Sequence, residues 1–291
     1  MQAQDLALLQ AVEANDMSLA QHLLQQNANV ETTQEDGSSL LLLAAQRQNL
    51  PLLHLLLQHG ANINHQNHLG HTALMNAAIN AHVDMISILL HYKADIHLTD
   101  ATRKTALFDA VASNNKEVTS MLLGSGCNPN HADEQGLTVL HYAAYQNNAE
   151  LINILIQMGS DPNALAEQRT TALNFAAREG ALSALEMLLS FDANPELADA
   201  SGNTPLLTAA LTNQTDIMKH LLQADVDANI QQPESGFTPL LISVNNNNLA
   251  AVELLISHAV DTRISSLPGE TALMLARKKG YSQLIEILQN H

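Results

Sequence analysis

The chain repeats itself every 33 residues along almost its whole length. A small hydroxyl residue followed by an apolar run returns at this interval, with a single interval of 34, and a full apolar triplet follows 16 residues after six of the eight anchors. The anchors are Ser39, Thr72, Thr105, Thr138, Thr171, Thr204, Thr238 and Thr271. A fixed period of this length predicts stacked structural repeats, in which each repeat contacts only its neighbours. Such a chain reaches 291 residues without a single large core.

Each repeat is expected to contain two short amphipathic helices. In the repeat anchored at Thr72, the first helix follows this threonine, a break falls at residues 80–82, and the second helix covers residues 83–91. The anchor hydroxyl suits the start of a helix, where it accepts a hydrogen bond from an unpaired backbone N–H. Neither helix is long enough to be stable alone, so each needs the next repeat to cover its apolar face.

Three features set the close packing and the turns of the repeats. Alanine pairs in the first helix, such as Ala77-Ala78 and Ala143-Ala144, let neighbouring helices approach closely. The end of the second helix needs a left-handed backbone, which suits the residues found at most copies: Asn27, Gly60, Gly126, Gly159, Asp192 and Asp225. Lys93 and Ala259 occupy the same place, where we expect strain or a different cap. Arg103 and Arg169 stand where a turn glycine is expected and predict altered turns.

The repeat resembles that of the ankyrin family. Residues 138–144 and 204–210 are similar to its T-P-L-H-x-A signature, and residues 60–64 and 159–163 to its G-A-D-x-N stretch. The resemblance implies an all-α repeat solenoid, built of helix-turn-helix repeats with β-hairpin-like connections. About nine repeats, including two caps, are expected in a single domain of residues 1–291: 1–33 (N-cap), 34–66, 67–99, 100–132, 133–165, 166–198, 199–232, 233–265 and 266–291 (C-cap).

The resemblance further implies a protein partner on the concave face, formed by the hairpin tips and the first helices. Aromatic side chains dominate binding hot spots, and the chain has only eight of them. We predict a contact centre at Tyr142, Tyr145, Phe108 and Phe175. The flanking candidates are Lys104, Arg178, Phe237, Ile79, Leu137 and His71. The alternative is that Phe108, Phe175 and even Tyr145 only fill gaps between helices.

Composition limits the choice of partner and compartment. Twelve basic against 29 acidic residues give a formal net charge of −17, which disfavours nucleic acid and anionic membranes. The single cysteine, Cys127, makes no intramolecular disulfide, so a cytoplasmic location is the simplest interpretation. Export stays open as an alternative, because an initiator Met could stand in place of a native signal. We expect no membrane span, no cofactor, no metal and a monomer when the partner is absent.

No catalytic motif is found, and three features have competing interpretations. His65, His68 and His71 could bind zinc, although a solvated hairpin tip is favoured. Cys127 could be a reactive thiol, but it stands in a repeat slot that is otherwise filled by alanine. Residues 277–279 form a basic run that could touch a partner, although a solvated helix face is favoured.

Two functions follow for a chain that we expect not to be an enzyme. The first is a scaffold or adaptor for a protein partner. The alternative is an inhibitor or immunity protein that neutralises a toxin or enzyme. An acidic chain would suit a basic target of that kind.

Overall fold

The computed structural model describes residues 2–291, which form eighteen α-helices and one short 3-10 helix. Its contacts divide the chain into two compact units, Met1–Glu134 and Gln135–His291, and each is described by itself. The first unit contains α1 (Ala3–Glu13), α2 (Met17–Gln25), α3 (Leu40–Gln46), α4 (Leu50–Gln58), α5 (Ala73–Ile79), α6 (Val83–His91), α7 (Ala106–Ala112) and α8 (Lys116–Gly124).

The second unit contains five helix pairs. They are α9 (Val139–Tyr145), α10 (Ala149–Gln157), α11 (Ala172–Glu179), α12 (Leu182–Ser190), α13 (Pro205–Leu211), α14 (Thr215–Gln223), α15 (Pro239–Asn245), α16 (Leu249–Ser257), α17 (Ala272–Lys279) and α18 (Ser282–Gln289). The 3-10 helix η1 (Glu167–Arg169) lies in the loop before α11. The predicted break at residues 80–82 and the predicted second helix over residues 83–91 are both confirmed by α5 and α6.

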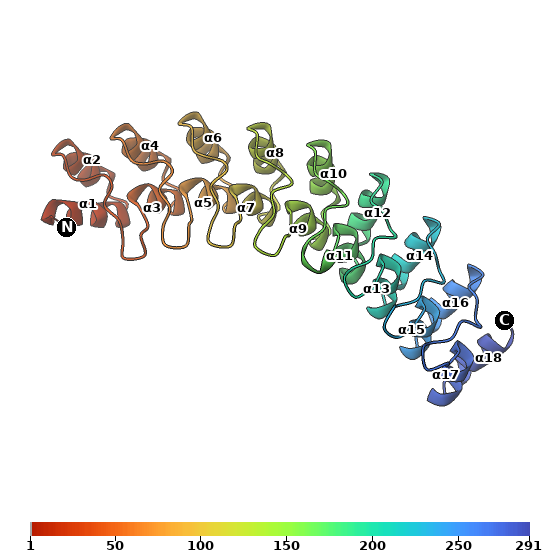
Figure 1. Ribbon diagram of the computed structural model, residues 1–291. Helices are drawn as coiled ribbons and strands as arrows, with labels where there is room; N and C mark the ends of the chain where they lie inside the picture. The colour runs from red at the N-terminus through yellow and green to blue at the C-terminus, as the bar shows by residue number, and fades with distance from the viewer. Residues whose placement is uncertain (1) are drawn as a thin grey trace. The chain divides into compact units, whose positions relative to one another are not determined.

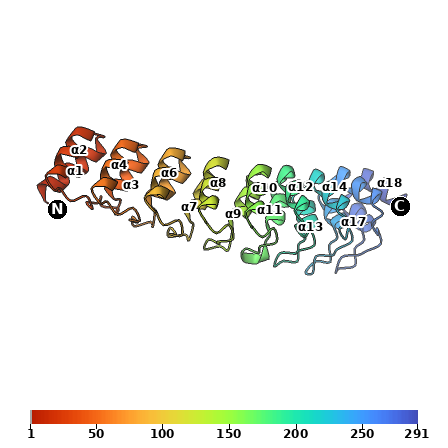
Figure 2. The same cartoon turned by 90° about the horizontal axis from the view of Figure 1, so that it is seen from above.

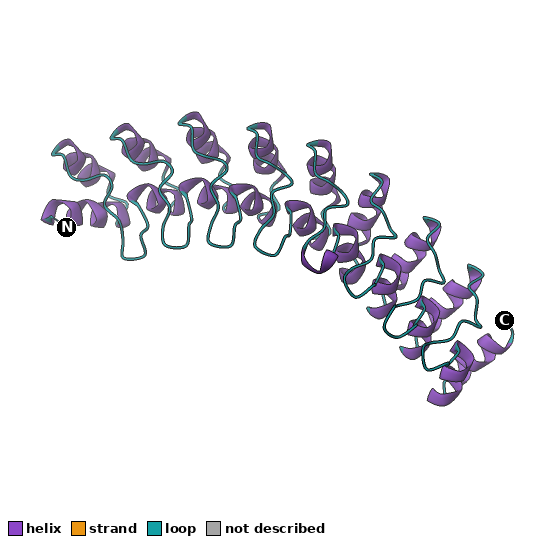
Figure 3. Ribbon diagram, viewed as in Figure 1, coloured by secondary structure: helices purple, strands orange, loops and turns teal. Residues whose placement is uncertain are grey.

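Within each unit the helices pack in two rows. The odd-numbered helices pack on one another in one row, and the even-numbered helices form the other row (Figure 1). The long loops lie beside the odd-numbered helices, away from the second row (Figure 3). In the view from above, the loops of each unit lie on the same side of the helices (Figure 2). We call the surface made by odd-numbered helices and long loops the first-helix face of that unit.

The core follows the repeat period. The middle residue of each full apolar triplet is completely buried, and the alanine pairs that were expected to allow close approach are at most 1% exposed. The triplet residues concerned are Leu56, Leu89, Leu122, Leu155, Leu188 and Leu255. Burying a leucine side chain stabilises a fold by about 1.5–3 kcal/mol. Each repeat therefore adds a similar layer to one continuous core within its unit.

The anchor hydroxyls start most of the first helices as expected. In six repeats the hydroxyl accepts a hydrogen bond from the backbone N–H three residues later, at 3.2–3.5 Å. These anchors are Ser39, Thr72, Thr171, Thr204, Thr238 and Thr271. Thr105 makes no side-chain cap, and there the N–H of Phe108 donates to the backbone carbonyl of Thr105 at 2.9 Å.

Consecutive hairpin loops are joined by single backbone hydrogen bonds. The N–H of Ala101 donates to Leu69 at 2.9 Å in the first unit, and that of Ala200 donates to Gln168 at 2.7 Å in the second. The inserted residue of the 34-residue interval places Pro233 beside Gly202, and a proline has no N–H to continue the pattern. Among residues 2–291 the β-structure is limited to two isolated bridges, so these connections are hairpin-like without strands.

The left-handed position after each second helix is confirmed. Lys93 (φ 66°) and Ala259 (φ 54°) adopt the same conformation as the glycine, asparagine and aspartate residues of the other repeats. The expectation of a different cap is therefore wrong at both places. The alternative expectation, a strained left-handed backbone at a residue with a side chain, applies instead. The turn at Arg103 is also regular, with φ 65° and an N–H that donates to Asp100 at 3.0 Å, as Gly70 donates to Asn67 at 2.8 Å. The predicted change is confirmed only at Arg169, where the loop forms η1.

Candidate functional site

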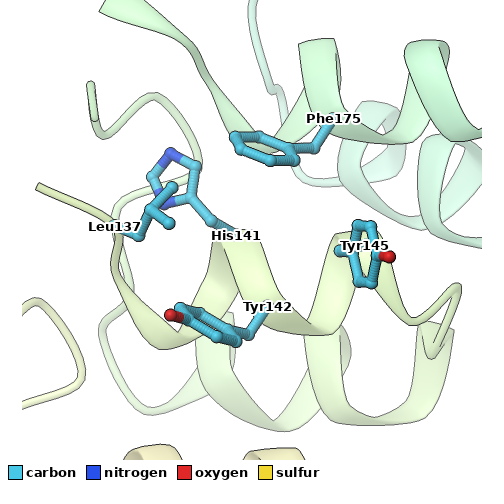
Figure 4. Close-up of a pocket in the computed structure, with 5 residues that line it drawn as sticks. All are labelled: Leu137, His141, Tyr142, Tyr145 and Phe175. Carbon is cyan, nitrogen blue, oxygen red and sulfur yellow. The ribbon is translucent and has the colours of Figure 1, made fainter. Parts of the chain in front are cut away.

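The first-helix face of the second unit carries an apolar pocket of about 200 Å³. It is lined by Leu137, His141, Tyr142, Tyr145 and Phe175 (Figure 4). Three of these residues were predicted from the sequence to form an aromatic contact centre, and Leu137 was predicted to flank it. The structure therefore brings together Tyr142, Tyr145 and Phe175 in one cavity.

The repeat places these aromatic side chains next to one another. Tyr142 and Tyr145 are three residues apart on α9, a spacing that puts them on the same side of a helix. Phe175 on α11 follows Tyr142 by one period of 33 residues, and α9 packs against α11. Tyr145 is 58% exposed, and Tyr142 and Phe175 are half-buried. The pocket thus exposes aromatic surface from α9 and α11.

His141 lines the pocket as a structural residue. Its ring is 1% exposed, and its Nδ1 accepts a hydrogen bond from the N–H of Thr138 at 3.1 Å. Its Nε2 lies 3.1 Å from the carbonyl oxygen of Thr170, so the proton sits on Nε2 in the neutral ring. The ring meets Phe175 edge to face, with 5.7 Å between centroids. Because both nitrogens make hydrogen bonds, the imidazole is held in place, and its edge-to-face contact supports Phe175.

Arg178 covers the outer side of Phe175. Its guanidinium carbon lies 4.6 Å from the centre of the ring, a distance at which a cation is attracted to an aromatic face. The same guanidinium pairs with Glu179 at 2.9 Å. Arg178 therefore lies beside Phe175, with its charge paired to Glu179.

The remaining predicted residues lie elsewhere. His71 and Ile79 line a second pocket, of about 140 Å³, on the first-helix face of the first unit, together with Met75, Asn76 and Asp109. Lys104 is half-buried in the loop before α7. Phe237 is half-buried in the loop before α15 and does not line the aromatic pocket.

Phe108 is 3% exposed and fills space inside its repeat, where its ring meets His131 at 6.2 Å. The prediction that Phe108 contacts a partner is therefore corrected. The reason is its register: Phe108 is the third residue after its anchor, which points into the stack, whereas Tyr142 and Phe175 are the fourth. The gap-filling alternative applies to Phe108 and not to Tyr145.

Asp109 is a residue of the first unit's pocket that the sequence interpretation missed. The sequence could have identified it, because Asp109 is the fourth residue after its anchor, and leucine, tyrosine, phenylalanine or isoleucine occupies this position in most repeats. Burial is the main cause that raises the pKa of Asp109 to about 7, Asp100 adds to this increase, and Lys104 opposes it. A carboxyl group in such a setting marks a candidate functional position.

The three features with competing interpretations have the following surroundings. His65 Nε2 lies 2.8 Å from the carbonyl oxygen of Gly37, and within residues 2–291 no three metal-binding side chains are grouped. Cys127 is 6% exposed, and burial raises its pKa to about 12, which confirms that it is a packed core thiol. Residues 277–279 are exposed, and Lys278 Nζ pairs with Glu270 at 2.5 Å, as a solvated helix face predicts.

The fold and its faces define a helical-repeat protein. A family model described as ankyrin repeats (3 copies) matches residues 8–100, 92–166, 140–232 and 213–291. The chain therefore belongs to the ankyrin repeat family, whose members are generally modules for protein–protein interaction and typically lack enzymatic activity. A search of curated proteins returns no match. In the part of the chain that the structure describes, no helix combines the length and the apolar character that crossing a membrane requires.

Proposed function

We propose that this chain is a non-enzymatic scaffold or adaptor that holds a protein partner on its first-helix face. The observation that carries the proposal is the aromatic pocket of the second unit. Tyr145 leaves 58% of its surface in solvent on a helix whose alanine residues are fully buried. Exposed tyrosine beside half-buried aromatic rings is the composition of protein-binding hot spots.

The other properties of the chain agree with this role. A net charge of −17 disfavours nucleic acid and anionic membranes as partners. The single cysteine is buried in the core, which fits a reducing compartment such as the cytoplasm. We propose a monomer in the absence of the partner.

Capture of the partner from the native host, followed by mass spectrometry, tests the proposal. Wild-type protein is compared with a Tyr142→Ala/Tyr145→Ala variant, and the affinity of each recovered protein is then measured by calorimetry with purified components. We expect Tyr145→Ala alone to weaken binding by about 30-fold, the equivalent of a hot-spot loss of about 2 kcal/mol.

The matched control is Tyr92→Ala, which removes a half-buried tyrosine that follows α6 in the second row of helices. This control should bind the partner as wild type does, and circular dichroism should show that all variants are folded. Equal affinity of the wild-type and Tyr145→Ala proteins would remove the aromatic pocket from the interface.

The alternative is that the chain is an inhibitor or immunity protein for a basic toxin or enzyme. The excess of acidic residues favours a basic target over a neutral one, because opposite charges accelerate the encounter between two proteins. Two findings together would support neutralisation. A toxin-like gene would lie beside the gene for this chain, and expressing the toxin-like gene without this chain would inhibit growth. A partner whose activity is unchanged in the complex would support the scaffold.

A further inference from the structure

The first unit has a pocket with chemistry unlike that of the aromatic pocket. It lies on the first-helix face between α5 and α7, and its volume is about 140 Å³. Met75 and Ile79 supply apolar walls, His71 stands at the edge, and Asn76 and Asp109 supply polar groups. Ile79 is 43% exposed, so the wall reaches from the interior to the solvent.

Asp109 is the acidic side chain in the lining of this pocket. No hydrogen bond or ion pair joins its carboxylate to another residue within 2–291, whereas nearby Asp100 accepts from the backbone N–H groups of Thr102 and Lys104 at 2.8 and 2.9 Å. His71 Nε2 lies 3.8 Å from Asp100, not against Asp109. A partly buried carboxylate without hydrogen bonds costs stability.

We propose that this pocket recognises a cationic side chain, a lysine or an arginine, of the partner protein. The inference rests on the proposed function, since it assigns part of the chemistry by which the first unit would recognise the partner. The ammonium or guanidinium group would meet the Asp109 carboxylate, while its methylene stem lies along Met75 and Ile79. Long basic side chains bury their stems against apolar surface in this way.

The charges around Asp109 favour a cation over other ligands. Asp100 makes the surroundings more negative, and Lys104 compensates only in part, because burial and Asp100 together hold the pKa of Asp109 near 7. An anion would be repelled, and a neutral group would leave the carboxylate without a counter-charge. The second-row helices α6 and α8 pack against α5 and α7. Neither contributes a charged residue to the lining of the pocket.

A titration of the carboxyl group tests the proposal without any partner. The chain is labelled with ¹³C-aspartate, and the carboxyl resonance of Asp109 is assigned by its absence from the spectrum of Asp109→Asn. The probe is Nα-acetyl-lysine-N-methylamide. Nα-acetyl-norleucine-N-methylamide is the neutral control, and sodium chloride matches the ionic strength.

The probe should lower the pKa of Asp109 because it binds the ionised carboxylate alone. The decrease equals log(1 + [L]/Kd), so a Kd of about 50 mM gives a decrease of about 0.5 at about 100 mM probe. The norleucine analogue should leave the pKa unchanged. Equal pKa values in the lysine probe and in sodium chloride, or an equal effect of the norleucine analogue, would overturn the proposal. Because no partner is used, this result is independent of the capture experiment that tests the proposed function.

Discussion

His141 and Asn174 show how two different side chains do the same work in neighbouring repeats. His141 accepts a hydrogen bond from the N–H of Thr138, and Asn174 accepts one from the N–H of Thr171, both at 3.1 Å. Each then reaches the loop of the following repeat, His141 at Thr170 and Asn174 at Asn203, over 3.1 and 3.5 Å. The third residue after the anchor therefore needs a hydrogen-bond acceptor and a donor at a suitable separation. This explains why asparagine can replace histidine there without a change of fold.

Asp109 predicts a pH-dependent stability. The carboxyl group ionises near pH 3.8 in the unfolded chain and near 7 in the folded chain. Between these values the unfolded state releases a proton that the folded state keeps, so the stability contributed by this group falls as the pH rises and levels off above 7. Asp109→Asn has no carboxyl group to ionise, so it avoids this loss of stability at high pH. The difference in free energy of unfolding between Asp109→Asn and wild type should therefore favour the variant more at pH 8 than at pH 5, by roughly 1 kcal/mol or more, as measured by urea denaturation.

The control for this measurement is Glu117→Gln, which removes one negative charge from an exposed position on α8 in the same unit. Its effect on stability should differ little between the two pH values. If Asp109→Asn changed stability by the same amount at pH 5 and pH 8, the carboxyl group would be ionised in the folded chain at both, and the burial argument would fail.

The helices were the most predictable elements, because the same pattern of anchor and apolar residues recurs along the chain. The anchor threonines and the leucine triplets placed α5 and α6 to the residue. A second left-handed turn, between the two helices of each repeat, was missed, although a recurring asparagine marks it at Asn114, Asn147, Asn213 and Asn247. The pockets were less predictable. Each needs two helices in a known register, and the burial that separates Phe108 from Phe175 is a property of the stack.

The turn after each second helix predicts opposite effects of two exchanges. Ala259 carries a side chain at φ 54°, whereas Gly60 has φ 83° and no atom within 4 Å of an added Cβ. The left-handed conformation costs a residue with a side chain about 1–2 kcal/mol. Ala259→Gly should therefore raise the free energy of unfolding by about 1 kcal/mol and Gly60→Ala should lower it by a similar amount, as measured by urea denaturation.

The two exchanges control for one another, since each changes one methyl group at the same place in a repeat. Losses of stability in both variants would show that the Ala259 methyl group is packed and that contacts outweigh backbone strain. Gains in both would show that helix-end flexibility, and not the left-handed backbone, limits stability there.

The chain as a whole carries more negative charge than its ion pairs balance. The acidic residues outnumber the basic ones by 29 to 12, and each of the described ion pairs, such as Lys278 with Glu270, has at least one exposed side chain. Exposed pairs contribute little to stability, while excess charge of one sign destabilises a folded chain through self-repulsion. The same excess would accelerate the encounter with a basic partner. The excess of acidic residues is therefore expected to lower the stability of the folded chain.

This balance predicts that added salt stabilises the protein. The Debye length falls from about 30 Å at 0.01 M to about 8 Å at 0.15 M, which screens repulsion between distant carboxylates. The free energy of unfolding in urea should rise by something of order 1 kcal/mol over this range, equally in sodium and potassium chloride. A variant with Glu117→Gln, Glu253→Gln and Glu286→Gln, all exposed, should show a smaller gain because three charges are gone. A loss of stability with salt would mean that attractive pairs outweigh the repulsion, and the acidic surface would then be needed for folding and not only for attracting a partner.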